Sequence, residues 1–523
     1  MKAKFYFLLP LALLLLPACK RDSATQNSRT PEGIFHGMIE LGEKLDDPYT
    51  VANMQAAVEA VYPTKAGRTG ISATDLYVRF LPSSDAQLQK LRAQDVYLMD
   101  HPMDYRIIRE GDYYQDPSLD SESITWQYAV VPKDFSFPSG IKYEVLDECY
   151  LADHDPATKA DGLDWDAIEE AAFKLTGNEA MLLPRTKAEA FAPQGRITIE
   201  DPNFSGGKAF GLAGVQVACN VFVKISTCYT TRDGYYQMSK TFSSKPRYRV
   251  VFQNEKGFSI GFNWIIIPAS VSTLGKGGPE GIDYHITAEN DGALFRRSVV
   301  NNAAYDYYNR CIPADLDIPE PPSGMRFWIF PDISASSCAM LHHGSFVKNA
   351  LLEKYLGQYM GIIKQFLPDI TIGTKDQMNY ASIYSNVSHE LSHASHYAQV
   401  GNEFWGPYIE YVLESFVTQG GNCYGDGTAE NAGYCEVGEM WGYFMEASLF
   451  KDRYGGTLNS YGNSFWFKPD IFSYLYERGM SRSEMYRALT SEVHSRSALK
   501  EKLTTLYPER ETMIEQTFNR YGK

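Results

Sequence analysis

The chain has 523 residues, and its 64 acidic side chains outnumber its 49 basic ones, giving a formal charge of −15. An acidic chain with a pI near 5.2 lacks the basic surface of nucleic-acid-binding proteins, so nucleic acid is not expected among its partners. Hydrophobic residues at 44% and charged residues at 22% exclude extensive disorder, and eight cysteines are too few for a disulfide-built scaffold. A chain of this length is expected to form about three domains.

The first nineteen residues have the pattern of an export signal. Lys2 and Lys4 precede an apolar run over residues 5–16, which is too short to span a membrane as a helix. The run ends in Leu16-Pro17-Ala18-Cys19, and small residues directly before a cysteine resemble the cleavage site of bacterial lipoproteins. The resemblance implies that residues 1–18 are removed and that Cys19 carries a lipid, which would tether the chain to a membrane of the bacterial cell envelope. The alternative is a plain secretory peptide with an incidental cysteine.

The mature chain is expected to be a multidomain α+β protein. Residues 19–70 are polar and contain Gly, Pro and Ser, which predicts a tether followed by a helix over residues 40–62. Residues 71–190 are predicted to form an N-terminal α+β domain of unknown role. Its pattern indicates strands over residues 76–82, 96–99 and 126–131, and a helix over residues 83–93.

Residues 191–262 are rich in strand patterns. Alternating or β-branched runs cover residues 196–201, 215–217 and 248–253, and Asp233-Gly234 supplies a turn signal. This order resembles the small prealbumin-like β-sandwich that serves as a regulatory module in carboxypeptidases. The resemblance implies a packing module without catalytic residues of its own.

Residues 263–523 are predicted to form the last, mainly helical domain. The pattern indicates helices over residues 288–310 and 346–366, a strand over residues 326–330 and a short edge strand over residues 370–373. From Tyr380 onward the chain is predicted to be mostly helical. Beyond the signal no run of eighteen apolar residues occurs, so no membrane-spanning helix is expected.

One short motif carries chemistry, and it is His389-Glu390-Leu391-Ser392-His393. Four residues advance a helix by about 400°, so the two histidines lie about 40° apart on one face and one turn apart along it. Such a pair can bind one Zn²⁺, while Glu390 can act on a water molecule beside it. His396 shares this face but lies about 10.5 Å along the helix from His389, too far for both to bind one ion. A supporting, substrate-facing or exposed position is therefore expected for His396.

A catalytic zinc site needs a third protein ligand and an open position for water. Glu439 is favoured as this ligand, because the flanking Gly438 and Gly442 would let its helix approach the motif closely. Glu414, nearer along the chain, is the alternative, and Glu436 is a weaker third choice. The run around Glu439 resembles the second motif of gluzincins, zinc peptidases whose third ligand is a glutamate on a later helix.

The gluzincin resemblance implies a zincin-like metallopeptidase domain that hydrolyses peptide or protein substrates. Glu390 would be the general base, and Tyr443 and His494 are candidates for stabilising the oxyanion. The overall layout resembles multidomain surface lipoproteins of Bacteroidetes with a C-terminal zinc peptidase domain. The alternative is a non-catalytic surface lipoprotein with a vestigial zinc site, whose aromatic residues, 14% of the chain, bind a glycan or a host protein.

Overall fold

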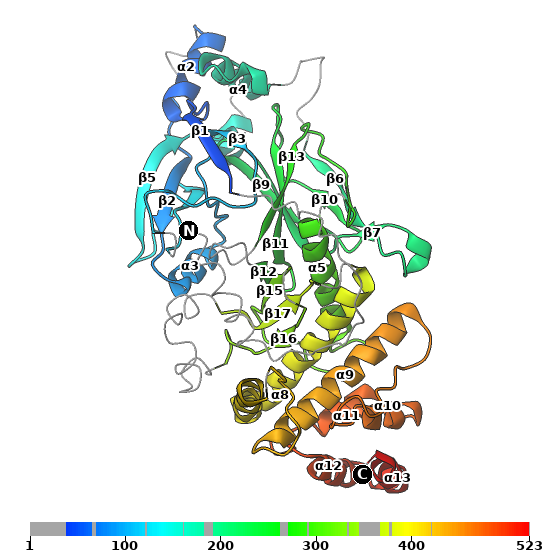
Figure 1. The fold of residues 1–523 in the computed structure, drawn as a ribbon. Coiled ribbons are helices and arrows are strands. Elements are labelled where there is room, and N and C mark those ends of the chain that lie inside the picture. The colour runs from blue at the N-terminus through cyan, green and yellow to red at the C-terminus, as the bar shows by residue number, and fades with distance from the viewer. Residues whose placement is uncertain are drawn as a thin grey trace.

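The computed structural model describes residues 38–64, 70–120, 123–159, 162–182, 192–261, 270–289, 292–331, 334–344, 367–375, 379–419 and 421–521. The predicted lipoprotein signal with Cys19 and the helix predicted over residues 346–366 lie outside these ranges. Within them, no helix has the length and apolar character needed to cross a membrane. The fold is a mixed α+β structure, as predicted, with its β-sheets in the earlier part of the chain and mainly helices after them (Figure 1).

The described residues of the N-terminal part form two antiparallel sheets and three α-helices. One sheet places β2 (Asp75–Leu81) between β4 (Gln127–Pro132) and β5 (Lys142–Cys149), and the other pairs β1 (Glu40–Lys44) with β3 (Tyr105–Arg109). Helices α2 (Val51–Val61) and α4 (Trp165–Leu175) pack together at the top of Figure 1, and α3 (Asp85–Arg92) follows β2.

Two predictions for this part are wrong. The helix predicted over residues 40–62 is a strand, β1, followed by the shorter helix α2. The side chain of Thr50 accepts a hydrogen bond from the backbone N–H of Asn53, and this cap fixes where the helix begins. The strand predicted over residues 96–99 does not form. In this segment only Met99 pairs with a strand, through an isolated bridge to Tyr128 of β4.

An eight-stranded sheet occupies the middle of the molecule (Figure 1). Its order is β16-β17-β15-β12-β11-β8-β9, with β13 also paired to β11. Neighbouring strands β12, β15 and β17 run parallel, whereas β16 is antiparallel to β17. The strands are β8 (Val215–Val221), β9 (Lys224–Tyr229), β11 (Arg247–Asn254), β12 (Ser259–Gly261), β13 (Val271–Lys276), β15 (Arg326–Phe330), β16 (Ser337–Cys338) and β17 (Ile370–Gly373).

This sheet crosses the domain boundary predicted at residue 262. Strands β8, β9, β11 and β12 precede that residue, and β13, β15, β16 and β17 follow it. Two of the strands expected for a separate β-sandwich, over residues 215–217 and 248–253, therefore share a sheet with strands of the last predicted domain. The strand expected over residues 196–201 belongs to another sheet. The predicted bounds of β17 are confirmed, but it lies between β15 and β16 and is not an edge strand.

A separate, four-stranded sheet is formed by strands between residues 194 and 286. The sheet contains β6 (Gln194–Ile199), β7 (Phe210–Gly211), β10 (Tyr235–Gln237) and β14 (Tyr284–Ile286). Within the described residues, short 3₁₀ helices cover Ala152–His154, Pro156–Lys159, Glu179–Met181, Ser205–Gly207 and Pro508–Arg510.

Long helices dominate the C-terminal part and position the candidate site. Helix α8 (Tyr380–Thr418) packs between α5 (Gly292–Arg310) and α9 (Ala432–Tyr454), and Figure 1 shows α8 and α9 side by side. At Gly401 the backbone of α8 leaves helical geometry (φ 60°, ψ −159°), so the helix consists of two segments. The remaining helices are α10 (Asp470–Glu477), α11 (Arg482–Arg487), α12 (Arg496–Leu506) and α13 (Glu511–Tyr521).

One hydrophobic core joins these parts. A continuous cluster of buried apolar side chains extends from Tyr49 in the N-terminal part, through the central sheet, to Phe518 in α13. The site helices α8 and α9 contribute some of its largest members, Trp405 and Trp441, both fully buried. Burial of this kind fixes the two helices against each other and so fixes the spacing of polar side chains between them.

Candidate metal centre

The first segment of α8 presents the predicted motif. The side chain of Asn379 caps this helix by accepting a hydrogen bond from the backbone N–H of Ser382 at 2.8 Å. His389 and His393 lie one turn apart, as predicted, and their Nε2 atoms are 3.0 Å from each other. His389, Glu390 and His393 are almost completely buried, and their donor atoms lie within 4.8 Å of one another. The three side chains therefore form a group that could hold a metal ion.

Glu439 of α9 completes this group from the opposite side. Its Oε2 lies 3.5 Å from Nε2 of His389, and its Oε1 lies 3.6 Å from Nε2 of His393. The hydroxyl of Tyr408 donates a hydrogen bond to Oε1 at 2.5 Å. Burial alone would raise the pKa of Glu439, but the two imidazoles and this hydrogen bond keep it below its usual value. Glu439 thus faces both histidines, and these contacts favour its ionised form.

The two alternative glutamates do not reach the histidines. Glu414 lies on α8 with its side chain exposed to solvent. Glu436 is buried one turn before Glu439, but its carboxylate pairs with Arg496 of α12. Of the three glutamates considered from the sequence, the structure brings only Glu439 to the motif.

Gly442 makes the close approach of α9 possible. A Cβ atom at this position would lie 2.8 Å from Nε2 of both His389 and His393. Real Cβ atoms do not approach other atoms this closely, so any side chain here would displace the histidines. Gly438 is different, because a Cβ there would make only ordinary contacts of 3.5 Å or more with Tyr408 and Phe404. The predicted need for a glycine is therefore confirmed at Gly442 and not at Gly438.

Glu390 is a buried carboxyl group that has no hydrogen-bond partner in the described part of the chain. The residue is 1% exposed, and among the described residues neither of its oxygens accepts a hydrogen bond. Burial raises its pKa to about 8, with smaller contributions from the negative charges of Glu439 and Glu446. A carboxylate in such a position is available to exchange a proton with a bound molecule.

Glu446 is the residue that the sequence analysis missed. Its Oε2 lies 3.2 Å from Nδ1 of His389, and its Oε1 accepts a hydrogen bond from Ser385 at 2.7 Å. A carboxylate at Nδ1 holds the proton there and leaves the lone pair of Nε2 free to bind a metal. The signal was present in the sequence, because Glu446 follows Glu439 by two helical turns and so shares its face.

Replacing Glu446 with glutamine is expected to weaken metal binding by about 10- to 100-fold, because the oriented imidazole loses its carboxylate. The measurement is a competition titration against a chromogenic chelator. Glu501→Gln, at an exposed position of α12, is the matched control and should leave affinity unchanged. Equal affinities for the two variants would show that Glu446 does not orient His389.

Aromatic rings surround the two histidines. The ring of Tyr443 lies edge-on to His389 at 4.7 Å, and Trp405 and Tyr408 lie 5.7 and 6.2 Å from His393. Tyr443 is thus at the site, as the oxyanion prediction requires, although its hydroxyl is 2.9 Å from the hydroxyl of Tyr424. These rings make the surroundings of the histidines largely apolar.

Two other histidines named from the sequence do not join the cluster. His494 is exposed and stacks on Tyr434 in the first turn of α9, at 4.6 Å. His396 is fully buried against Phe404 and Trp405, so of its three predicted positions the exposed one is excluded. Burial lowers the pKa of His396 to about 3 and keeps its imidazole neutral. His396 therefore belongs to the packing beside the site.

No family model, no curated protein and no solved structure matches this chain.

Proposed function

We propose that this protein is a zinc-dependent peptidase in which His389, His393 and Glu439 bind the metal. Tetrahedral zinc with bonds of about 2.0–2.1 Å places its ligand atoms about 3.3–3.4 Å apart. Here the two Nε2 atoms lie 3.0 Å apart, Oε2 of Glu439 lies 3.5 Å from that of His389, and Oε1 of Glu439 lies 3.6 Å from that of His393. The convergence of two imidazole nitrogens and one carboxylate, at separations close to those of a zinc site, is the observation that carries the proposal.

The chemistry of the donor set supports zinc over other metals. Two neutral imidazoles and one carboxylate, with a position left for water, are typical of catalytic zinc. Burial lowers the pKa of His393 to about 3, so its ring is neutral at physiological pH and can act as a ligand. Zinc bound here would lower the pKa of a water molecule toward about 7 and polarise a substrate carbonyl.

Glu390 supplies the proton transfer in this proposal. Its carboxylate takes a proton from the attacking water and returns it to the leaving amine. The absence of hydrogen bonds to its oxygens among the described residues supports this assignment, because nothing there competes for the proton. A cation held by the neighbouring ligands would also lower the pKa of Glu390, since opposite charge favours the ionised form. The peptide bond as the substrate, and the zincin-like nature of the domain, rest on the gluzincin resemblance of the two motifs.

Metal removal tests this function. Hydrolysis of a peptide library should stop when a chelator is added and return when Zn²⁺ is restored. Metal analysis should find about one zinc per chain, and Glu439→Ala should lose most of it because one of three ligands is gone. Glu414→Ala, which removes an exposed glutamate from α8, is the control and should keep its zinc. Chelator-insensitive turnover, or full zinc content in Glu439→Ala, would contradict the proposal.

We further propose that the protein is anchored in the bacterial cell envelope through lipidated Cys19. The support is the apolar run followed by Leu16-Pro17-Ala18-Cys19. Cells grown with an alkyne-labelled fatty acid should label the wild-type protein, and Cys19→Ala should abolish the label. Labelling that persists in this variant would contradict the anchor.

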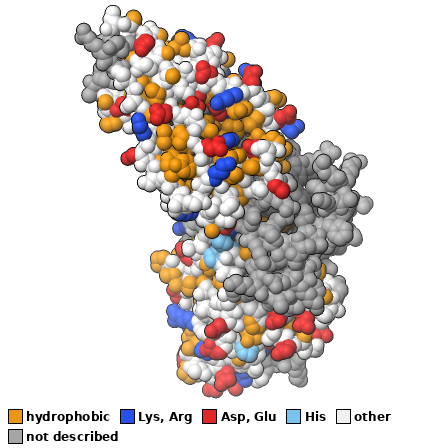
Figure 2. Space-filling view, turned by 90° about the vertical axis from the view of Figure 1, so that its left-hand side faces the viewer, with side chains coloured by type: hydrophobic (Ala, Val, Ile, Leu, Met, Phe, Trp, Pro, Cys, Tyr) orange, Lys and Arg blue, Asp and Glu red, His pale blue; other side chains and the backbone are white. Residues whose placement is uncertain are grey.

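A second candidate function, binding of a glycan or a host protein, is supported by one surface. Hydrophobic side chains gather on the upper part of the face shown in Figure 2. On the outer strand of the three-stranded sheet, β5, Tyr143 and Val145 are 43% and 46% exposed, and Tyr143 stacks on Phe137 at 4.0 Å. Absence of turnover across a broad peptide library, with the metal bound, would favour this function over hydrolysis.

A further inference from the structure

A small cavity lies between the N-terminal part and the central sheet, far along the chain from the metal centre. Its volume is about 40 Å³, where one water molecule needs about 10–15 Å³ by the same kind of measure. It therefore has room for about three waters or one small polyatomic ion. Three arginines line it, namely Arg92, which ends α3, and Arg247 and Arg249, which both lie on β11. This concentration of guanidinium groups in a buried place needs negative charge to balance it.

The positive charge of Arg247 is balanced by the carboxylate of Glu110. Its Nε donates a hydrogen bond to Glu110 at 2.9 Å, and another of its nitrogens donates to Nε2 of His101 at 3.1 Å. Because Nε2 of His101 accepts, the ring proton lies on Nδ1, which is 2.7 Å from Asp100. His101 is therefore neutral, and burial, the largest cause, lowers its pKa in agreement with this.

Both carboxylates that line the cavity are also engaged. Asp100 accepts from Nδ1 of His101 with one oxygen and from the backbone N–H of Tyr114 with the other, at 2.6 Å. Asp112 pairs with Arg297 at 2.9 Å. Neither carboxylate forms an ion pair with Arg249 or Arg92 in the described part of the chain.

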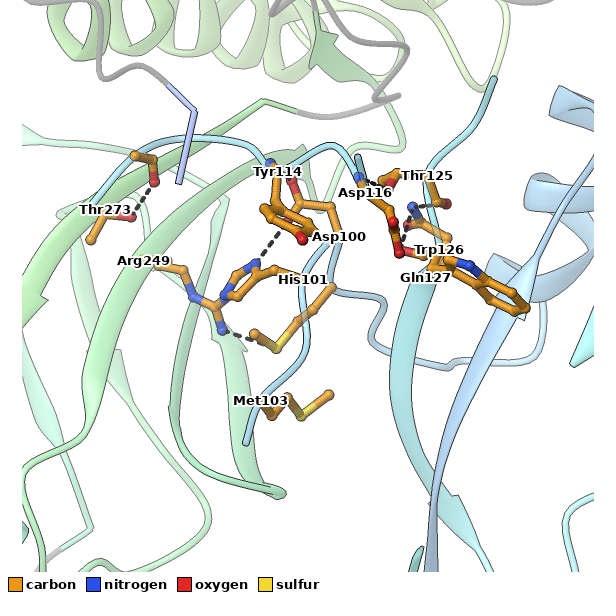
Figure 3. A network of polar contacts seen from close by, with 12 residues as sticks. Asp100, His101, Met103, Tyr114, Asp116, Thr125, Trp126, Gln127, Arg249 and Thr273 are labelled. Atoms are coloured by element: carbon orange, nitrogen blue, oxygen red, sulfur yellow. Dashed lines mark hydrogen bonds and ion pairs between the residues drawn. The ribbon is translucent and has the colours of Figure 1, made fainter. Parts of the chain in front are cut away.

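Arg249 lacks a negative partner among the described residues. It is 2% exposed, and its hydrogen bonds go to two neutral atoms, Oδ1 of Asn220 at 3.0 Å and Sδ of Met99 at 3.5 Å. Its Nε is buried, and no described residue accepts a hydrogen bond from it. Figure 3 shows the side chain extending from the sheet toward the loop that carries Asp100 and His101. A charged group with an unused donor thus faces the cavity.

Arg92 of α3 is the second arginine of the cavity that has no described carboxylate partner. No described carboxylate pairs with it, because nearby Asp85 forms its ion pair with Arg326 at 2.6 Å. Burial, followed by the positive charge of Arg326, lowers the pKa of Arg92 to about 10. The cavity therefore has two guanidinium groups without an anionic partner among the described residues.

We propose that this cavity is a binding site for a small tetrahedral oxyanion, phosphate or sulfate, held between Arg249 and Arg92. The planar guanidinium fork matches the oxygen geometry of such anions and binds them through charge-assisted hydrogen bonds. The bound anion joins α3 to β11 and so links the N-terminal part to the central sheet. This site is independent of the proposed peptidase activity.

Equilibrium dialysis of the full chain with radiolabelled phosphate tests the site. Wild-type protein should bind about one phosphate per chain, and its Tm should rise with the logarithm of phosphate concentration at ionic strength held constant with chloride. Unlabelled sulfate should compete. Arg249→Met should lose this binding and the phosphate-dependent shift in Tm, whereas Arg109→Met, an exposed arginine of β3 that is 67% exposed, should retain both.

The half-buried Arg92 provides a second variant if Arg249→Met fails to fold. Arg92→Gln should weaken phosphate binding at least tenfold, which dialysis reads directly. The proposal is overturned if the wild-type chain binds no phosphate, or if both Arg249→Met and Arg92→Gln bind it as the wild type does. Competition by a carboxylate such as acetate, with no effect of sulfate, would overturn the assignment to a tetrahedral anion.

Discussion

Replacing Glu390 with glutamine is expected to lower peptide hydrolysis by about 10²- to 10⁴-fold, the usual contribution of a general base. Glutamine has nearly the same shape but cannot accept the proton of the attacking water. Because the metal ligands in the proposal are His389, His393 and Glu439, the variant should keep its zinc. The measurement is kcat/KM together with metal content on the same preparation.

The matched control for this experiment is Glu414→Gln. It makes the same chemical change on the same helix, at a side chain that is exposed, and should leave both kcat/KM and zinc content unchanged. Full activity of Glu390→Gln would falsify the general-base assignment. Loss of zinc together with activity in Glu390→Gln would instead place Glu390 among the ligands.

Replacing Gly442 with alanine is expected to abolish tight zinc binding and with it all hydrolysis. The added Cβ would lie 2.8 Å from Nε2 of both histidines, so one methyl group would occupy space beside the metal. Overpacking of this kind costs about 1–3 kcal/mol, and the better helix propensity of alanine offsets up to about 1 kcal/mol of it. The fold should therefore survive while the site does not, which circular dichroism and metal analysis can separate.

Gly438→Ala is the control for Gly442→Ala. Both residues lie on α9 on either side of Glu439, but a Cβ at Gly438 would have ordinary van der Waals contacts. This variant should bind zinc normally and be slightly more stable, since alanine favours the helix. Normal zinc affinity in Gly442→Ala would contradict the close packing of α9 against the histidines.

The parts of the fold that local sequence determines were predictable. The bounds of β15 and β17 and the approximate extent of α5 follow from hydrophobic pattern alone. Strand pairing was not predictable, because nothing local indicates that β12 and β15, which lie more than sixty residues apart in the sequence, run side by side. The composition changes at the boundary predicted at residue 262, whereas the central sheet contains strands from both sides of it.

The candidate site likewise has residues that the sequence predicts and residues that only the packing of helices reveals. His389, Glu390 and His393 are spaced by one helix, so helical geometry alone brings them together. Glu439 could only be chosen from among several glutamates, because the number of residues between α8 and α9 does not determine which glutamate lies close to the histidines. Glu446 was missed because a glutamate on a helix is ordinarily a solvent-exposed residue, and only the packing of α9 against α8 buries it.

The break at Gly401 divides α8 into two segments that both contribute residues to the candidate metal centre. The segment before it carries both histidines, and the segment after it carries Trp405, which packs on His393, and Tyr408, which holds Glu439. The angle between the segments is set by a backbone conformation that suits glycine alone. The positions of the two histidines and of the residues that contact them thus both depend on the backbone geometry at one residue, so a substitution at Gly401 would act on the candidate site without altering any candidate ligand.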